Sequence, residues 1–458
     1  MFPRYSWVLT LYLLLPVTGC EKFLDKPADS SWQTLNTVAS FQGIMDKNSM
    51  TSLSTPGLGP VYVNDYRLAV DTQPATDSFL IGAYTWQLVL CENSIETSWG
   101  NPYDNIYACN TVLTELPQLT GLDSADLATS GFVLGQAFFE RAFMYYNLEE
   151  TFGQPYRPSR ASADPGVPLR LTENVLYNAP RASVATVYQQ IVADLQRAVS
   201  LLPVGLQMAN RNRPCRSAAY GLLAKVWLTC QDYVRAEAYA DSSLQWYSTL
   251  VDYNTLDSNS LYPFAITGNE EVLFQSYACN NALQYGKSIL IDSLLYRSYA
   301  PDDLRRVIFF TPVVGENNAY SFKGQYTGLH YLFSGVAVDE ILLIRAEARA
   351  WNGNLAGALA DVNTLLSKRW RYGRFVPYTA TTQDAVLRIV LMEKRKETLF
   401  REGRYYDLRR LNQYPAYADT LSRVYRGTMY TVLPGSASYA WPIPLQEINL
   451  DGEKQNPE

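Results

Sequence analysis

Two glutamates four residues apart are the first candidates for chemistry in this chain. Glu393 and Glu397 lie within 385–410, whose first half repeats apolar residues at three- and four-residue steps and predicts a helix that Gly403 ends. Paired carboxylates hydrolyse glycosidic bonds when they face each other across a substrate. On adjacent turns of one helix, however, both lie behind the same surface. We therefore interpret the pair as structural and expect no catalytic residue.

The cations that follow these glutamates favour the structural interpretation. A carboxylate on a buried face is unfavourable unless a cation meets it. Five arginines are close in sequence: Arg395, Arg401, Arg404, Arg409 and Arg410. We expect them to neutralise the glutamates and to fix one register between this helix and its neighbours. We call Glu393, Glu397, Arg404 and Arg409 the predicted clasp.

Composition excludes several classes of function. The 458 residues carry a net charge of −6, and an acidic surface argues against nucleic acid, whose phosphates require basic partners. The one histidine, His330, argues against a histidine-based triad and a multi-histidine metal site. The 34 tyrosines and 9 tryptophans combine a large apolar area with a polar tip, which suits binding surfaces as well as cores.

The first residues are typical of a targeting segment rather than of a fold. Residues 1–19 contain Arg4 and the apolar run Trp7–Val17, which is too short to span a bilayer as a mature helix. The run ends in Thr18-Gly19-Cys20, which resembles a bacterial lipobox and implies cleavage before Cys20 and acylation of that residue. Residues 20–32 are then a polar tether. The alternative is an ordinary secretory signal with an incidental cysteine.

Five further cysteines are present: Cys91, Cys109, Cys215, Cys230 and Cys279. An exported protein can form disulfides, but an odd number leaves at least one thiol free. No two of them have the CxxC spacing of a metal site. We expect no cofactor, and the sequence leaves open the disulfide state and the binding of a structural calcium ion.

Helical periodicity and loop composition divide the chain. Apolar residues recur at helical spacing mainly in 103–152, 184–247 and 338–412. Residues 51–101 and 249–334 are rich in Gly, Pro, Asn and aromatic residues and predict loops with a few short strands. Short paired helices with small residues at their crossings resemble tetratricopeptide repeats, although ordinary helical hairpins give the same pattern.

Eight segments, taken in order, resemble one known family. They are GQAFFERAFMYYNLEETFGQPY (135–156), DLQRAVSLLP (194–203), AAYGLLAKVWL (218–228), DDLRR (302–306), FKGQY (322–326), DEILLIRAEARAWNGNLAGALADVNTLLSKR (339–369), MEKRKETLFREGRYYDLRR (392–410) and WPIPLQEI (441–448). Behind a lipobox, this set is similar to the SusD/RagB family of outer-membrane, surface-exposed lipoproteins of Bacteroidetes. At Lys394-Arg395-Lys396 this chain departs from the less basic, Arg-rich spacing that is usual in the family. The departure concerns the packing of this segment and does not affect the resemblance to the family.

The resemblance implies both a fold and a function. The fold is mainly α, a single SusD-like domain over 20–458, with tetratricopeptide-like hairpins on one side and a loop-rich, minor-β ligand face on the other. The function is to bind an oligosaccharide at the cell surface and to pass it to a TonB-dependent, SusC-like outer-membrane barrel, without catalysis. A peptide ligand, or a helical protein-interaction scaffold without a small ligand, remains the alternative.

Candidate ligand contacts are expected in the loops of 71–101 and 296–326. Aromatic side chains stack on the apolar C–H faces of sugars, and carboxylates and amides bind hydroxyls. We expect Trp86 and Trp99, with Tyr84, to form stacking platforms; Asp71, Asp77 and Asn93 to bind hydroxyls; and Tyr296 and Tyr320 to close the site. For each tryptophan the alternative is core packing.

The lipobox generates the first testable prediction. Cys20→Ala removes the only acceptor for the acyl chains, so it should abolish acyl labelling and release the protein from the membrane. Metabolic labelling with a fatty acid and membrane fractionation measure the two effects. Unchanged membrane retention would show that Cys20 is incidental.

Overall fold

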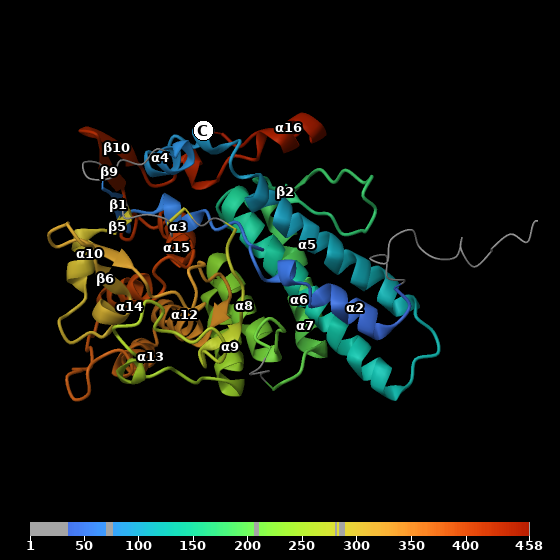
Figure 1. Ribbon diagram of the computed structural model, residues 1–458, viewed down its shortest axis with the longest axis horizontal. Helices are drawn as coiled ribbons and strands as arrows, with labels where there is room; N and C mark the ends of the chain where they lie inside the picture. Colours follow the sequence, from blue (N-terminus) through green and yellow to red (C-terminus); the bar gives the residue numbers. More distant parts are fainter. Residues whose placement is uncertain (1–34, 70–76, 206–209, 280–281, 284–288, 458) are drawn as a thin grey trace, which may run out of the picture.

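Small and apolar residues at helical spacing form the paired helices of the scaffold. The structure, a computed structural model, describes residues 35–69, 77–205, 210–279, 282–283 and 289–457. The scaffold helices are α2 (Val38–Met45), α5 (Glu96–Glu115), α6 (Ser124–Phe152), α7 (Val184–Leu201), α8 (Arg216–Thr229), α9 (Tyr233–Trp246), α12 (Val338–Trp351), α13 (Leu355–Ser367), α14 (Gln383–Glu397) and α15 (Gly403–Leu411). In Figure 1, α2, α5, α6 and α7 run side by side at one end, and α8, α9, α12 and α13 continue the scaffold.

Close helix contact in this scaffold depends on glycine. A Cβ built on Gly221 of α8 would lie 2.4 Å from Cδ1 of Ile341 on α12, so glycine here leaves room for the end of the Ile341 side chain. Helix ends are capped by side chains, as where Asp123 accepts hydrogen bonds from the amides of Ala125 and Asp126 at the start of α6. None of the helices in the described ranges is long and apolar enough to cross a membrane.

The remaining face is built from short helices and strand pairs. Its helices are α3 (Gly59–Tyr62), α4 (Ser78–Tyr84), α10 (Ser293–Ser298), α11 (Arg305–Ile308) and α16 (Leu445–Asp451). Across the whole described chain, antiparallel pairs join β1 (Tyr66–Leu68) to β5 (Ile289–Ile291), β2 (Pro165–Pro168) to β3 (Arg181–Ser183), β4 (Val272–Phe274) to β8 (Val336–Ala337), β6 (Phe310–Pro312) to β7 (Tyr320–Phe322), and β9 (Leu421–Tyr425) to β10 (Thr428–Val432). The predicted helical, minor-β fold is confirmed.

Two local predictions are wrong. The stretch 51–101 is more ordered than its Gly and Pro content indicates, because α5 begins at Glu96 and carries Pro102 inside it. The helix before Gly403 ends earlier, at Glu397, since Phe400 and Glu402 adopt positive φ angles of 60° and 59° and turn the chain into α15.

The five cysteines whose disulfide state the sequence left open are all free thiols: Cys91, Cys109, Cys215, Cys230 and Cys279.

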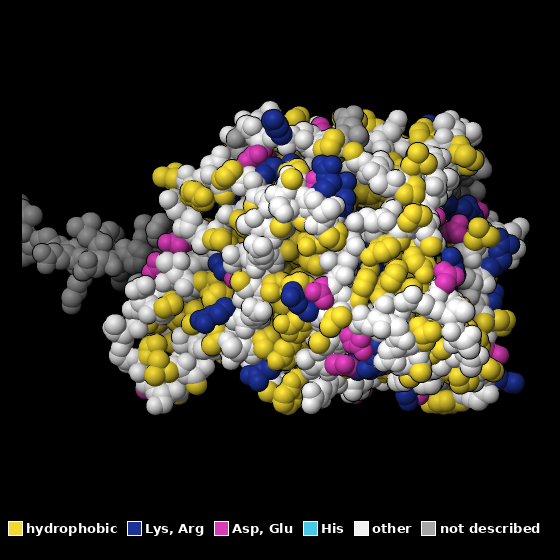
Figure 2. Space-filling view, turned by 180° about the vertical axis from the view of Figure 1, so that it is seen from behind, with side chains coloured by type: hydrophobic (Ala, Val, Ile, Leu, Met, Phe, Trp, Pro, Cys, Tyr) yellow, Lys and Arg dark blue, Asp and Glu magenta, His cyan; other side chains and the backbone are white. Residues whose placement is uncertain are grey.

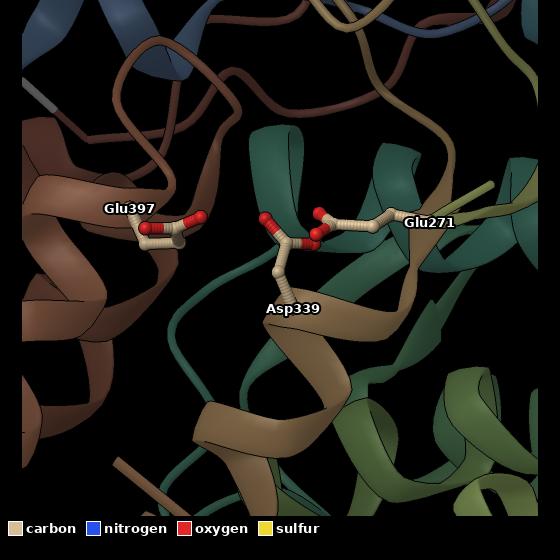
Figure 3. Close-up of side chains that lie close together, drawn as sticks. All are labelled: Glu271, Asp339 and Glu397. Atoms are coloured by element: carbon tan, nitrogen blue, oxygen red, sulfur yellow. The ribbon is translucent and has the colours of Figure 1, made fainter. Parts of the chain in front are cut away.

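The glutamates of α14 lie in a buried ion-pair core. Arg305 on α11 contacts Glu393 at 2.6 Å and Glu397 at 3.0 Å, and Arg369 contacts Glu397 at 2.7 Å. The core contains the carboxyl groups of Glu271, Asp303, Asp339, Glu393 and Glu397 and the cations Arg305, Arg369, Lys396 and Arg401. Figure 3 shows three of these carboxyl groups converging from α12, α14 and the segment before β4.

The partners of the predicted clasp therefore differ from those expected. Glu393 and Glu397 are buried and paired, but the arginines that form direct ion pairs with them are Arg305 and Arg369 rather than those that follow in sequence. Arg404 pairs with Asp419 at 2.5 Å, and Arg409 contacts Glu150 at 3.3 Å. Arg395, Arg401 and Arg410 pair with Asp65, Asp339 and Glu347, respectively. The arginines therefore clamp α14 and α15 to other elements.

The carboxyl groups in and near this core differ in their pKa values, because burial and the neighbouring cations act on them to different extents. Burial disfavours ionisation of Glu397, but Arg369, Arg305 and Arg401 outweigh it and lower the pKa to about 2. Burial dominates at Glu271 and raises its pKa to about 7, although Arg369 opposes the shift. Burial also raises the pKa of Glu402 to about 7, opposed by the hydrogen bond from the Gly59 amide.

The core generates a prediction about stability. Glu397→Ala leaves Arg305 and Arg369 buried without this partner, so the free energy of unfolding should fall by about 3–5 kcal/mol. The matched control is Asp384→Ala on the same helix, because the Asp384–Arg388 pair is exposed and should contribute little to stability. Denaturant unfolding measures both. Equal stability of the two variants would show that Glu397 is solvated.

A second prediction concerns pH. Because the pKa of Glu402 is raised from 4.5 to about 7, the folded state holds a proton that the unfolded state lacks between these values. Its contribution to stability is therefore largest below pH 4.5 and falls as the pH rises to 7, by up to about 3 kcal/mol. Glu402→Gln should flatten the loss of stability between pH 4.5 and pH 7. Parallel curves for parent and variant would contradict the raised pKa.

Candidate functional site

One buried arginine organises the aromatic residues of the loop-rich face. Arg423 is the central residue of β9, and alternation along the strand turns its side chain inward. Its guanidinium carbon lies 4.7, 4.5 and 4.6 Å from the ring centroids of Tyr66, Tyr84 and Trp86. The same group donates hydrogen bonds to the carbonyls of Val61, Val63, Ala83 and Tyr84. Burial lowers the pKa of Arg423, and the neighbouring tyrosines oppose this shift.

Trp86 is held in a conformation that its side chain disfavours. Its φ of 55° lies in the left-handed region, which costs a non-glycine residue on the order of 1–3 kcal/mol. The ring is fixed by Arg423 and by a 2.9 Å hydrogen bond from Nε1 to the carbonyl of Tyr62. Such positions persist only where the surroundings determine them, and they cluster at ligand sites. Trp86 is therefore a functional candidate on structural grounds.

Trp86 is 9% exposed and contributes to the lining of an open hollow of about 410 Å³, which we call the Trp86 hollow. Its other lining residues are Gln87, Leu88, Val89, Leu90, Glu92, Ser438, Ala440, Pro442, Gln455, Asn456 and Pro457. The lining is mainly apolar, with hydroxyl, amide and carboxyl groups at its sides. This size and composition are typical of a site for a small organic ligand.

The carboxyl-terminal segment fixes one wall of this hollow. The amide of Asn456 donates to the carbonyls of Phe152 and Trp441, both at 2.7 Å. Gln455 exchanges hydrogen bonds with the backbone of Ile443 at 2.7 and 2.8 Å and reaches Glu92 at 3.2 Å. Because both amides are held by the backbone of other segments, the wall is preformed.

A second hollow, of about 450 Å³, lies beside the same arginine. Arg423 and Tyr84 contribute to its lining together with Asn64, Tyr66, Arg67, Asp292, Leu294, Leu295, Ser298, Met392, Arg395, Ser422 and Val424. Arg395 contacts Asp65 at 2.6 Å. We call it the Arg395 hollow. Its lining carries more charge than that of the Trp86 hollow, so the two differ in the ligand chemistry they suit.

The structure brings together only some of the predicted contacts. Tyr84 and Trp86 meet at Arg423, and Tyr296 and Tyr320 stack with ring centroids 3.7 Å apart while Arg306 lies 4.8 Å above Tyr296. Asp77 instead accepts a hydrogen bond from the amide of Phe79 as the N-cap of α4. Asn93 is exposed in the turn after Leu88–Cys91. Asp71 lies outside the described residues.

Trp99, the other predicted stacking platform, lies in the core and lines neither the Trp86 hollow nor the Arg395 hollow. Trp99 lies on α5, where its ring is buried and packs edge-on against Phe152 at 5.1 Å and against Tyr103 at 5.0 Å. Sequence reasoning also missed Arg423, which follows a Tyr-rich irregular stretch. The alternation of LSRVY and TMYTV around Arg426-Gly427 is the signal of a hairpin that would have placed it.

Neither metal binding nor catalysis is favoured by the carboxyl groups. Oxygens of Glu271, Asp339 and Glu397 lie within 4.8 Å of one another, which is close enough to hold an ion (Figure 3). Arg369 and Arg401 already donate to them, so the positive charge is supplied and we assign the cluster to the ion-pair core. Among the described residues that line the Trp86 hollow, Glu92 is the single carboxylate, whereas glycoside hydrolysis needs two.

Arg423 generates a prediction about the site. Arg423→Lys keeps the charge but loses the planar group that contacts three rings and several carbonyls. We expect the free energy of unfolding to fall by about 2 kcal/mol, in the range of a desolvated cation–π contact. Arg426→Lys, an exposed change in the same hairpin, is the control. If denaturant unfolding gives the same stability for both variants, Arg423 does not hold the aromatic cluster.

Comparison with known proteins gives consistent matches over most of the chain. Residues 22–228 match a family described as "Starch-binding associating with outer membrane", and residues 339–458 match one described as "SusD family". A curated relative, "SusD-like protein P2" of Formosa agariphila, is 26% identical over 376 residues, which is 69% of this chain and 72% of the relative.

Solved structures of the same kind share the fold. A SusD superfamily protein from Bacteroides thetaiotaomicron aligns with a TM-score of 0.74 at 19% identity, covering 92% of this chain and 100% of that chain. A protein named as a putative sugar binding protein, from Bacteroides vulgatus, aligns with a TM-score of 0.73 at 19% identity, covering 93% and 99%. At these identities the likeness establishes the fold alone.

Proposed function

The chain belongs to the SusD family, whose members bind nutrients at the outer membrane, and we propose that it takes an oligosaccharide in the Trp86 hollow. This proposal rests on Trp86. The residue has a positive φ angle, its ring is held by Arg423 and by the carbonyl of Tyr62, and it lines a preformed hollow. A sugar ring presents an apolar face that an indole can cover and hydroxyls that amide and carboxyl groups can bind. Gln87 and Glu92 supply such groups.

The ligand class follows from the charge of the site and from the family. The lining residues that the structure describes supply one carboxyl group and no basic side chain to the Trp86 hollow, which suits a neutral ligand. Starch fragments are the natural first probe, since the matching family is described as starch-binding. Glu92 at the wall contributes a hydrogen-bond acceptor rather than one member of a catalytic pair.

The proposal includes a place in the cell and a partner. Acylation at Cys20 would hold the chain on the outer face of the outer membrane, and a TonB-dependent, SusC-like barrel would receive the ligand. The matched family's association with the outer membrane supports the location. A barrel with a plugged lumen needs its substrate delivered at the outer opening, which is the role of a ligand-binding protein above it.

A peptide ligand is the second candidate, and the Arg395 hollow favours it. Arg67 and Asp292 line this hollow beside the exposed apolar side chains of Leu294 and Val424. Such a mixture suits the termini and side chains of a short peptide better than a neutral sugar. Arg67→Ala, which removes an exposed side chain of this hollow, should then weaken peptide binding while leaving sugar binding unchanged.

The proposal predicts a specific loss of affinity. Trp86→Ala removes the indole from the hollow and should weaken binding of maltooligosaccharides by about 1–3 kcal/mol, from the apolar area that a ring covers. Calorimetry measures the affinity, and circular dichroism verifies the fold. Trp246→Ala, which removes a tryptophan that is 49% exposed at the end of α9, is the matched control.

Three outcomes separate the alternatives. Loss of affinity in Trp86→Ala alone supports the site. Equal affinity in both variants would contradict it, and a parent that binds short peptides but no oligosaccharide would favour the Arg395 hollow. Trp99→Ala should lower stability instead of affinity, because this ring is in the core.

A further inference from the structure

The segment between β2 and β3 carries a group of apolar side chains in an unusual position. Val175, Leu176 and Tyr177 follow one another and are 69%, 89% and 47% exposed, and Leu171 precedes them at 42%. We call residues 171–177 the apolar loop. Single exposed apolar residues are ordinary, but several together on a projecting segment mark a surface that contacts something.

The apolar loop is held in place rather than left loose. The amide of Asn110 on α5 donates to the carbonyls of Arg170 and Thr172 at 2.9 and 3.2 Å. Thr114, one turn further along α5, donates to the carboxylate of Glu173 at 2.9 Å. These contacts fix the base of the loop against a long helix, so the exposure of its tip is built into the fold.

A turn then directs the tip outward. Asn174 accepts a hydrogen bond from the amide of Leu176 with its side chain, at 3.0 Å, and one from the amide of Tyr177 with its carbonyl, at 3.1 Å. Beyond the tip, Arg181 of β3 donates to the carbonyl of Gly166 at 2.7 Å and closes the loop. The loop therefore presents Val175, Leu176 and Tyr177 at its apex.

The position of the loop indicates what it meets. In Figure 1 the loop after β2 and the start of α2 lie toward the same end of the long axis. Figure 2 shows hydrophobic side chains distributed over the whole of the opposite face of the molecule. The described chain begins at the end where the loop lies, at residue 35. Residues 20–34 can span at most about 50 Å, so an anchor at Cys20 would keep this end within that distance of the bilayer.

We propose that the apolar loop dips into the lipid surface beside the acylated Cys20 and acts as a second membrane contact. This inference rests on the lipid anchor of the proposed function and deepens it. A projecting apolar apex flanked by a tyrosine suits the boundary between headgroups and acyl chains, which accepts any convex apolar shape. A protein partner would require a complementary surface. Two contacts would also fix how the protein stands on the membrane.

The test uses the full lipoprotein reconstituted into phosphatidylcholine vesicles with brominated acyl chains, which quench tryptophan within the apolar layer. Leu176→Trp adds a reporter at the apex, and Val314→Trp adds one at a position that is 98% exposed on the β6–β7 hairpin. After subtraction of the parent's emission, most of the emission added at position 176 should be lost in brominated vesicles. That added at position 314 should be retained and should be quenched by aqueous iodide.

Each result supports or overturns the proposal. Flotation of the protein with the vesicles tests the lipid anchor separately. If the parent protein floats but the tryptophan of Leu176→Trp is still quenched by iodide, the loop contact alone is contradicted. A parent that does not float contradicts the anchor and the loop contact with it. Protection of position 176 in native outer membranes but not in pure lipid vesicles would assign the loop to a protein partner and overturn the membrane contact. The affinity of the same samples for a glycan tests the proposed binding function independently of the membrane contact.

Discussion

Burial of opposite charges in one place is the constraint on which this structure depends. Arg305 and Arg369 belong to segments that precede α14, yet both must reach Glu397, because a buried guanidinium or carboxylate without a partner is strongly destabilising. Glu271 and Asp339 bring β4 and α12 into the same cluster. Apolar packing alone allows several registers between helices, whereas these ion pairs have good geometry in only one register. The scaffold and the loop-rich face are thereby joined.

The same segment leads from the ion-pair core to the site. Beyond Glu397 the chain turns into α15, where Glu402 accepts a hydrogen bond from the amide of Gly59 at 3.0 Å and Tyr405 packs on Tyr62 with centroids 5.1 Å apart. The carbonyl of Tyr62 in turn holds the indole of Trp86. The conformation of Trp86 is thus set by contacts that continue back to the buried charges. A preformed site of this kind loses little entropy when it binds a ligand.

Sequence reasoning predicted what local patterns determine. Helical periodicity located the scaffold, and the burial of Glu393 and Glu397 followed from their position on an apolar face. Their partners could not be predicted, because Arg305 and Arg369 are nearly a hundred and nearly thirty residues away and no period links them. Arg423 was missed for the same reason: three rings that surround it come from 66–86. Trp99 was misplaced because Gly100 and Pro102 obscure the start of α5.

The location of the ligand site is the central claim, and hydrogen exchange with and without a maltooligosaccharide tests it most directly. The backbone amides of 84–92 and 436–456, which include the wall of the Trp86 hollow, should exchange more slowly when the ligand is bound. Those of α8, α9 and α13 should be unchanged. Protection confined to the helical hairpins, or around the Arg395 hollow alone, would contradict the assignment of the sugar site to Trp86.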